Sequence, residues 1–435
     1  MEEILDLAKR VAEEAEVYQI NSSYTPVSFE ANKLKQMETK ETRGAALRLV
    51  RNGRVGFSAT TDLRDPMKLV NDALAVAELG AEAKFHFPSA AIKREIQVYD
   101  PLVEGLEVAA MIDLGRGVIE KVLAYNSSIL CDVGISKHVE EVLLINSRGG
   151  EAAYKKTAMA GSVHGNLMRD TEMLDVYDER VACQLAASYD DLAEKLIESF
   201  EQAKRVATAP TKSMPVLFTP KGIAGTLMLP LQAALNGKTV LQGASALGDR
   251  LEQRVFDPRV TIIDDGTLDF APRSAVCDDE GVATRRTPIV EQGVLKNFYY
   301  DLQTAGLAGR ESTGNGFRSL YSLPSPSPTS VLVAEGHDAF EDMVKGVKEG
   351  ILVDQVMGAW AGNVLSGDFS ANVHLGYKIE NGQIAGRVKD TMVAGNVFEA
   401  LKNGLEAIGK EAVWIHGSLK VPALLFKSIS VSTKH

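Results

Sequence analysis

Cysteine is scarce in this chain of 435 residues, and its pattern excludes two classes of protein. The three cysteines, Cys131, Cys183 and Cys277, are odd in number, widely separated and never part of a Cys-x-x-Cys pair. A disulfide scaffold needs paired cysteines, and a thiolate zinc cluster needs closely spaced ones. The sequence therefore predicts reduced, buried cysteines.

Long apolar runs are also absent. No apolar segment reaches the roughly 18 residues that a membrane-spanning helix needs. The first residues, Met1-Glu2-Glu3-Ile4, show no basic segment followed by an apolar one, as a secretory signal would. Together with an ordinary apolar share of 45%, these features predict a folded, cytoplasmic protein.

An excess of basic residues is lacking as well, since the formal net charge is −11. A surface that neutralises many phosphates needs clustered Lys and Arg. The acidic balance therefore argues against nucleic acid as a partner, and any DNA-related role would have to be indirect.

Several catalytic motifs are missing. Gly309 and Gly314 have the first spacing of a phosphate-binding loop, but Asn315-Gly316 stands where Lys-Ser/Thr is required. There is no Gly-x-Ser-x-Gly elbow of a serine hydrolase. Zinc sites on helices show histidines one turn apart, whereas no two of the seven histidines lie within five residues: His86, His138, His164, His337, His374, His416 and His435. We keep His374 and His416 in view because both fall on predicted strands.

Length and pattern predict an α+β protein of two domains, because a single core stops growing near roughly 250 to 300 residues. Segment 207–215 has two prolines among small polar residues and marks the boundary. We expect residues 1–208 to form an N-terminal α/β-type domain with helices packed on antiparallel strands and an internal duplication of element order. Residues 209–435 are expected to form a β-rich C-terminal domain, shaped as a barrel or a curved sheet.

Apolar periodicity predicts the main elements. Hairpin turns are expected at Asn52-Gly53, Gln292-Gly293 and Asn381-Gly382. Segment 221–235 has a helical pattern interrupted by Pro230, where a helix would kink or stop. Helices are expected at about 4–15, 65–79, 108–125, 190–206, 339–348 and 397–408.

The stretch 261–318 is unusually dense in loops of Asp, Gly, Asn, Ser and Thr. Its segments are 263–267, 277–281, a hairpin at 292–293, and 311–318. Loops built from such residues often line a functional site. They also serve as turn punctuation in β-rich domains, and the residues alone leave both interpretations open.

Five segments in this order resemble motifs of the TldD/PmbA family, a bacterial and archaeal group of metallopeptidases once described as modulators of DNA gyrase. They are Val-Thr-Ile-Ile-Asp-Asp-Gly-Thr at 260–267, Asp-Glu-Gly at 279–281, Gly-Val-Leu at 293–295, Ser-Thr-Gly-Asn-Gly at 312–316 and Ile-Glu-Asn-Gly at 379–382. The resemblance spans essentially the whole chain. It implies a peptidase-type activity in the family as a whole.

Catalytic members of that family carry His-Glu-x-x-x-His upstream of the aspartate loop, with two zinc ligands and a glutamate base. The matching positions here are Leu229, Pro230 and Ala234, and residues 222–243 contain no His, Glu, Asp or Cys. The family's third zinc ligand is a late cysteine before a glycine, and His416-Gly417 stands in its place. We expect no catalytic residue and no metal in this chain, His416 being the one candidate ligand.

The resemblance therefore implies the PmbA (TldE) branch, whose members pair with a zinc-bearing TldD subunit. Such a heterodimer encloses a chamber in which an unfolded peptide is cleaved, and strand edges of this chain would help to hold the peptide. The substrate-binding candidates are Asp279, Glu280, Ser312, Thr313, Gly314, Asn315 and Arg318. A homodimer of the isolated chain is also expected.

An alternative is an independent hydrolase with a non-standard site. Paired carboxylates can bind a divalent ion or share acid and base roles when their pKa values are pushed apart. The candidates for such a site are Asp264, Asp265, Asp279 and Glu280 with His374 or His416.

Overall fold

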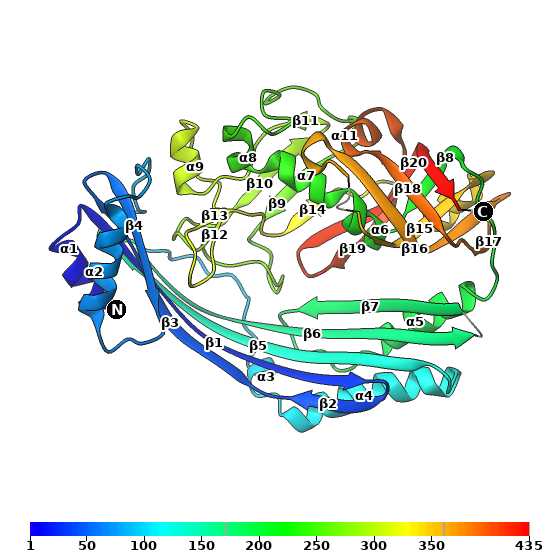
Figure 1. The fold of residues 1–435 in the computed structure, drawn as a ribbon, viewed down its shortest axis with the longest axis horizontal. Helices are drawn as coiled ribbons and strands as arrows, with labels where there is room; N and C mark the ends of the chain where they lie inside the picture. The colour runs from blue at the N-terminus through cyan, green and yellow to red at the C-terminus, as the bar shows by residue number, and fades with distance from the viewer. Residues whose placement is uncertain (170–171, 360–361, 435) are drawn as a thin grey trace.

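The computed structural model describes residues 1–169, 172–359 and 362–434 and contains two large sheets that face one another (Figure 1). The first sheet is antiparallel, with the order β4-β3-β1-β5-β6-β7 and β2 paired to β1. Its strands are β1 (Glu14–Glu30), β2 (Lys33–Met37), β3 (Lys40–Arg51), β4 (Arg54–Thr60), β5 (Leu130–Asn146), β6 (Glu151–Arg169) and β7 (Glu172–Ala182).

Helices cover one face of the first sheet. Near one end α1 and α2 enclose a small apolar core with β1 and β3, and toward the other end α4 and α5 enclose a larger one. The helices are α1 (Glu2–Lys9), α2 (Pro66–Ala77), α3 (Pro101–Glu104), α4 (Val108–Tyr125) and α5 (Asp190–Gln202).

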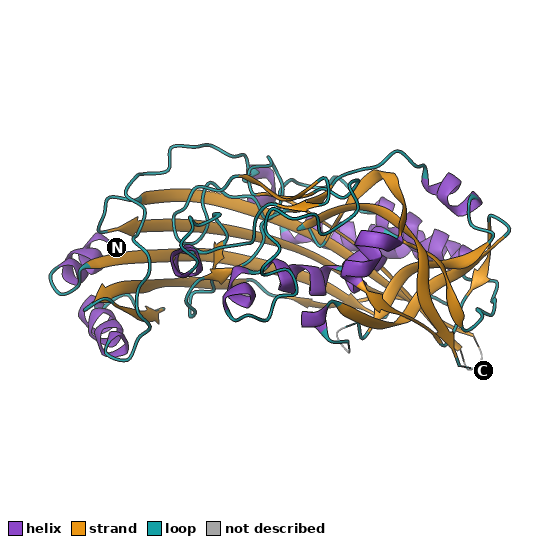
Figure 2. Ribbon diagram, turned by 90° about the horizontal axis from the view of Figure 1, so that it is seen from above, coloured by secondary structure: helices purple, strands orange, loops and turns teal. Residues whose placement is uncertain are grey.

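Strand alternation decides which side chains reach the other face. In β1, Ala15 and Val17 belong to the core under α1 and α2, so Glu16 and Tyr18 point to the opposite face. The second half of the chain lies over that face, as the view from above also shows (Figure 2). Residues on this inner face are therefore placed to contact loops from the second half.

The second sheet closes into a five-stranded barrel-like arrangement. The path β8-β15-β16-β18-β20 returns to its start because β8 pairs with both β15 and β20. These strands are β8 (Lys212–Phe218), β15 (Glu349–Met357), β16 (Asp368–Glu380), β18 (Thr391–Asn396) and β20 (Leu419–Thr433). The predicted α+β class with a barrel-like C-terminal half is confirmed.

Short strands extend this sheet beside the barrel. They are β9 (Ile262–Asp265), β10 (Arg286–Glu291), β11 (Val294–Leu295), β14 (Val331–Val333), β17 (Gln383–Arg387) and β19 (Leu405–Ile415), with β12 (Gly316–Phe317) and β13 (Ser325–Pro326) as a separate pair. The remaining helical segments are α6 (Pro220–Thr226), α7 (Met228–Leu235), α8 (Gly237–Leu241), α9 (Leu302–Leu307), α10 (Phe340–Lys345), η1 (Val364–Ser366), α11 (Val397–Glu399) and η2 (Ala400–Gly404).

Several predicted elements are confirmed by the structure. Asn52 and Gly53 connect β3 and β4 with φ angles of 50° and 69°, as a primed turn requires. Helix α2 begins after Asp65, whose carboxylate accepts a hydrogen bond from the Lys68 backbone N–H. Helix α4 has the predicted bounds of 108 and 125.

Two predicted helices are wrong in their second halves. The first ends at Lys9, and Ala15 lies in β1, because pairing with two neighbouring strands outweighs the helical spacing. The helix expected over 397–408 gives way to β19 at Leu405, which pairs with Phe426. His416 lies in the turn after β19 and not on a strand, with a φ of 51°.

The helical segment is interrupted as predicted, but the break lies at Leu227, before Pro230. Helix α6 ends at Thr226 and α7 starts at Met228, so Pro230 stands in the first turn of α7. Backbone N–H groups there have no partner within the helix, so a proline costs little.

The two sheets share one apolar core. Phe29 and Val133 of the first sheet belong to the same buried cluster as Leu217, Leu352 and Leu425 of the barrel strands. The division of the chain at residue 208 and the internal duplication stay predictions. Among the described residues, no helix is long and apolar enough to cross a membrane.

Candidate functional site

The two loops singled out in the sequence lie against each other. The backbone N–H of Asp279 donates to the Gly316 carbonyl at 2.9 Å, and the Gly316 N–H donates to Asp278 Oδ2 at 2.8 Å. The Arg318 N–H donates to Asp279 Oδ2 at 2.9 Å. The segments 278–281 and 311–318 therefore form one unit.

This unit is joined to the first sheet by buried ion pairs. Glu16 and Arg48 are cross-strand neighbours on β1 and β3. Arg48 donates from Nη2 to Glu16 Oε2 at 3.1 Å and from Nη1 to Glu280 Oε1 at 2.5 Å. Arg318 Nη2 lies 3.0 Å from Glu16 Oε1, and the four side chains are at most 2% exposed. Two cations are thus matched to two carboxylates in a dry environment, where an unpaired charge would be costly.

The remaining candidates hold the loop itself. Asn315 Nδ2 donates to Asp264 Oδ2 at 2.7 Å, and Asp264 Oδ1 accepts from the Thr329 N–H at 2.8 Å. Thr313 Oγ1 accepts from the Tyr300 N–H at 2.8 Å. The Gly314 N–H donates to the Ser312 hydroxyl at 3.1 Å. These hydrogen bonds stabilise the conformation of the loop 311–318.

Burial limits what the candidate residues can contact. Glu280 and Asn315 are fully buried, and Ser312 and Thr313 are 8% exposed. Most polar atoms of these side chains are already hydrogen-bonded within the fold, as buried polar groups usually are, and Asn315 Oδ1 is an exception among the described residues. A role of the seven candidates in binding peptide stays a prediction.

Burial raises the pKa values of four carboxyls in this region: Asp264, Asp278, Asp279 and Glu280. Burial raises the pKa of Asp264 to about 6, against hydrogen bonds from Asn315 and Thr329 that lower it. Burial likewise raises the pKa of Asp279 to about 6. Protonation near neutral pH is therefore within reach of both groups, which is the property that acid–base chemistry needs.

The structure does not bring the histidines of the alternative hydrolase site to these carboxylates. His374 Nε2 lies 3.6 Å from Asp175 Oδ2, and His416 Nδ1 lies 2.5 Å from Glu179 Oε1. Over residues 1–169, 172–359 and 362–434, no three His, Cys, Asp or Glu residues are grouped so that they could hold a metal ion. The geometry therefore gives the alternative no assembled site.

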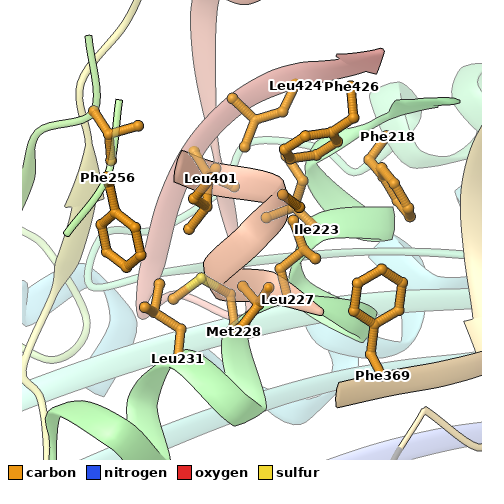
Figure 3. Packing of buried hydrophobic residues seen from close by; sticks show 14 of the residues in the cluster. Phe218, Ile223, Leu227, Met228, Leu231, Phe256, Phe369, Leu401, Leu424 and Phe426 are labelled. Atoms are coloured by element: carbon orange, nitrogen blue, oxygen red, sulfur yellow. The ribbon is translucent and has the colours of Figure 1, made fainter. Parts of the chain in front are cut away.

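Segment 222–243, where the resemblance places the zinc motif, contributes to an apolar core. Figure 3 shows Ile223, Leu227 and Leu231 surrounded by phenylalanine and leucine side chains from the barrel and neighbouring segments. Pro230 and Ala234 are buried, and Leu229 is 49% exposed. Hydrocarbon side chains supply no ligand for zinc. The residues present do not fit the metal, and no catalytic step is assigned to it in this chain.

Sequence reasoning missed Glu16 and Arg48. Each is a charged residue between apolar ones on a strand, in Ala15-Glu16-Val17 and Leu47-Arg48-Leu49. A charge in the middle of a predicted buried strand is a usable signal, because it must find a partner on the other face. The identity of that partner, 232 residues away, needed the fold.

The fold is that of a metallopeptidase-related family. Residues 211–433 match the PmbA/TldA metallopeptidase C-terminal domain, and residues 15–77 match PmbA/TldA metallopeptidase domain 1. The chain belongs to the PmbA/TldD family, which confirms the resemblance found in its sequence.

Individual relatives agree over almost the full length. An uncharacterized protein of Methanocaldococcus jannaschii is 29% identical over 435 residues, covering 98% of each chain. A metalloprotease PmbA homolog of Haemophilus influenzae is 24% identical and covers 92% of this chain and 88% of its own. The crystal structure of TldE from Thermococcus kodakarensis has a TM-score of 0.89 at 22% identity, with 99% of each chain covered. That structural likeness supports the fold.

Proposed function

We propose that this chain is a TldE-like subunit of a metallopeptidase complex and carries no zinc of its own. Peptide hydrolysis would be done by a TldD-like partner with a zinc site, and this chain would close the chamber and hold the unfolded peptide. The same proposal places the complex in the cytoplasm and gives it a heterodimeric form.

One observation carries the proposal. Family motifs are kept around a segment, 222–243, that has no His, Asp, Glu or Cys to bind zinc or act as its base. Its apolar residues are used in the barrel core, so the loss is compensated by packing. A protein that keeps the family fold without the catalytic set is suited to a binding role.

Strand edges offer a physical route for peptide binding. Among the described strands, β7 pairs only with β6, so its outer edge has no strand partner. An extended peptide can add to such an edge through main-chain hydrogen bonds, which do not depend on its sequence. This supports a subunit that handles unfolded substrates of varied sequence.

The test compares the chain alone with the chain plus a TldD-like partner. Zinc would be measured by elemental analysis, association by light scattering, and cleavage with an unfolded fluorogenic peptide. We expect a 1:1 complex whose cleavage is abolished by chelation, with no cleavage and less than about a tenth of an equivalent of zinc in the chain alone. Stoichiometric zinc or zinc-dependent cleavage in the isolated chain would refute the proposal.

His416 provides the matched control, because it replaces the family's third ligand. His416→Ala should leave the zinc content and the cleavage rate of the complex unchanged. A loss of zinc in that variant would show that this chain contributes a ligand after all.

A further inference from the structure

A cleft lies apart from the candidate loops. It has a volume of about 310 Å³ and lies between the two halves, bordered by β7 and α5 on one side and by the β8–α6 junction and β19 on the other. Leu352 and Tyr377 are buried in its wall, and Trp414 is partly buried there. Its volume is near the lower end of small-ligand sites, about 300 to 1,000 Å³. The cleft therefore suits one small group and not a folded partner.

Carboxylates outnumber cations around this cleft. The ionisable lining residues are Asp178, Glu179, Glu198, Asp354, Lys195, Lys221 and His416. The lining carries four negative and two positive charges when His416 is neutral, a net of −2, and a net of −1 when His416 is protonated. Lys195 Nζ is 4.0 Å from Asp191, which lies outside the lining, so part of its charge is used elsewhere. A negatively charged cleft with apolar walls concentrates cations.

The cleft already contains one cationic side chain, that of Lys221. Lys221 Nζ lies 2.8 Å from Asp178 Oδ2, and the Asp178 side chain is 6% exposed. Burial lowers the pKa of Lys221, but the carboxylates of Asp354 and Asp178 raise it, and the net result is a pKa above the ordinary value of a lysine. Asp354 Oδ1 accepts a hydrogen bond from the Thr219 hydroxyl at 2.8 Å, which is a neutral partner. Two carboxylates thus face one ammonium, and half of their charge is uncompensated.

Aromatic rings complete the complementarity. The Lys221 ammonium lies 5.7 Å from the centroid of the Tyr177 ring, so a cation–π contact is already present at this end. Tyr377 and Trp414 line the same space. Aromatic faces and aliphatic side chains favour a ligand that carries its charge on an apolar stem.

We propose that this cleft binds an organic cation with an apolar stem, an alkylammonium or guanidinium group. The ligand is a free amine or the side chain of a lysine or arginine residue in a peptide, and the two share the chemistry that the cleft recognises. This binding requires no zinc and no partner subunit. A failure of the proposed complex would therefore leave the inference about the cleft unchanged.

The test uses the full chain with Trp360→Phe, which leaves Trp414 as the one tryptophan of the two. Agmatine, acetyl-Ala-Arg-Ala-amide and the matching citrulline peptide, which is neutral and nearly the same size, would be titrated by Trp414 fluorescence and calorimetry. We expect at least one of the two cations to bind at least tenfold more tightly than the citrulline peptide and to weaken as salt is raised. If the arginine peptide binds at least tenfold more tightly than agmatine, the ligand is assigned to peptides. If agmatine binds as tightly as the arginine peptide, the ligand is assigned to free cations.

Variants separate the cleft from the overall charge of the protein. Asp354→Asn keeps the oxygen that accepts from Thr219 and should weaken cation binding at least tenfold. Glu198→Gln, at an exposed position of α5, should weaken it several-fold without risk to folding. Glu82→Gln makes the same charge change at the exposed Lys84 pair outside the cleft and should have no effect. Equal binding of the arginine and citrulline peptides, absence of any cation binding, or equal effects of Asp354→Asn and Glu82→Gln would overturn the proposal.

Discussion

At the residue scale, charge pairing decides how the candidate loops sit on the first sheet. Glu16, Arg48, Glu280 and Arg318 form an alternating set of charges that water does not reach. Removing one member of a buried pair is expensive because the other charge stays buried without compensation. These side chains therefore matter more for assembly of the fold than an exposed ion pair of the same length.

Arg48→Met should destabilise the protein by about 3–5 kcal/mol, because Glu280 loses its cation and Glu16 loses one of two. The measurement is the free energy of unfolding in denaturant. Arg64→Met is the control, since the Arg64 side chain is 89% exposed in its pair with Asp62, and a surface change of this kind costs within about 0.5 kcal/mol. Equal small losses in both variants would contradict the structural role of the network.

A glycine in the same place tests its packing. A Cβ on Gly316 would lie 2.3 Å from Glu280 Oε2 and 2.7 Å from Glu280 Cγ. Gly316→Ala should therefore destabilise by about 1–3 kcal/mol through overpacking. Gly117→Ala is the matched control in α4, where the added Cβ would meet no atom within 4 Å, and it should stabilise by about 0.5–1 kcal/mol. Thermal unfolding of the two variants should thus shift in opposite directions.

At the element scale, a hairpin tip docks on an edge strand. The turn between β19 and β20 places His416 Nδ1 2.5 Å from Glu179 Oε1 of β7. A Cβ on Gly417, which has a φ of 62°, would lie 3.1 Å from Val181 Cβ on the same strand. The tip therefore covers the edge of β7 at Glu179 and Val181, and a peptide can pair only with the remainder of that edge.

This contact should make stability depend on pH. The hydrogen bond with Glu179 raises the pKa of His416, and the hydrogen bond with His416 lowers the pKa of Glu179. The histidine contribution is complete below its unfolded pKa, about 6.5, and is lost as pH rises through the raised value. The glutamate contribution is complete above its unfolded pKa, about 4.3, and is lost as pH falls through the lowered value.

The pair should therefore stabilise most between about pH 4.3 and 6.5. Its size should stay under about 1 kcal/mol because His416 is 58% exposed and water screens the charges. The difference in unfolding free energy between the wild type and His416→Gln, measured at pH 5.5 and pH 8.5, checks this. A difference that is larger at pH 8.5 would show that the sign is wrong.

At the scale of the whole molecule, the two sheets are coupled through a common core. Leu425 lies on β20 of the barrel and belongs to the buried cluster that also contains Cys131 of β5. Structure that shares a core unfolds as one unit, whereas independent domains unfold separately. The chain should therefore behave as a single cooperative unit.

Leu425→Ala should lower the unfolding free energy by about 2–5 kcal/mol and should do so for both halves together. Thiol labelling of Cys131, with Cys183 and Cys277 replaced by alanine, reports on the first sheet. Trp414 fluorescence, with Trp360 replaced by phenylalanine, reports on the second half. Coincident transitions are expected for both probes in the wild type and in the variant. Labelling of Cys131 at a denaturant concentration that leaves Trp414 unchanged would show that the halves are independent.

Local sequence determined those parts of the molecule that depend on neighbouring residues. Asn52-Gly53 specified its turn, Asp65 with Pro66 specified the start of α2, and the motifs at 260–267 and 312–316 specified the family. The lack of His, Asp, Glu and Cys over residues 222–243 was also visible, because it depends on residue identity alone. Tertiary structure decided the rest: it converted Ala15 and residues 405–408 to strand, closed β8 onto β20, and joined Glu16 and Arg48 to loops more than 200 residues away. Such contacts depend on which strands pair and which faces meet, and no local pattern in one chain records that choice.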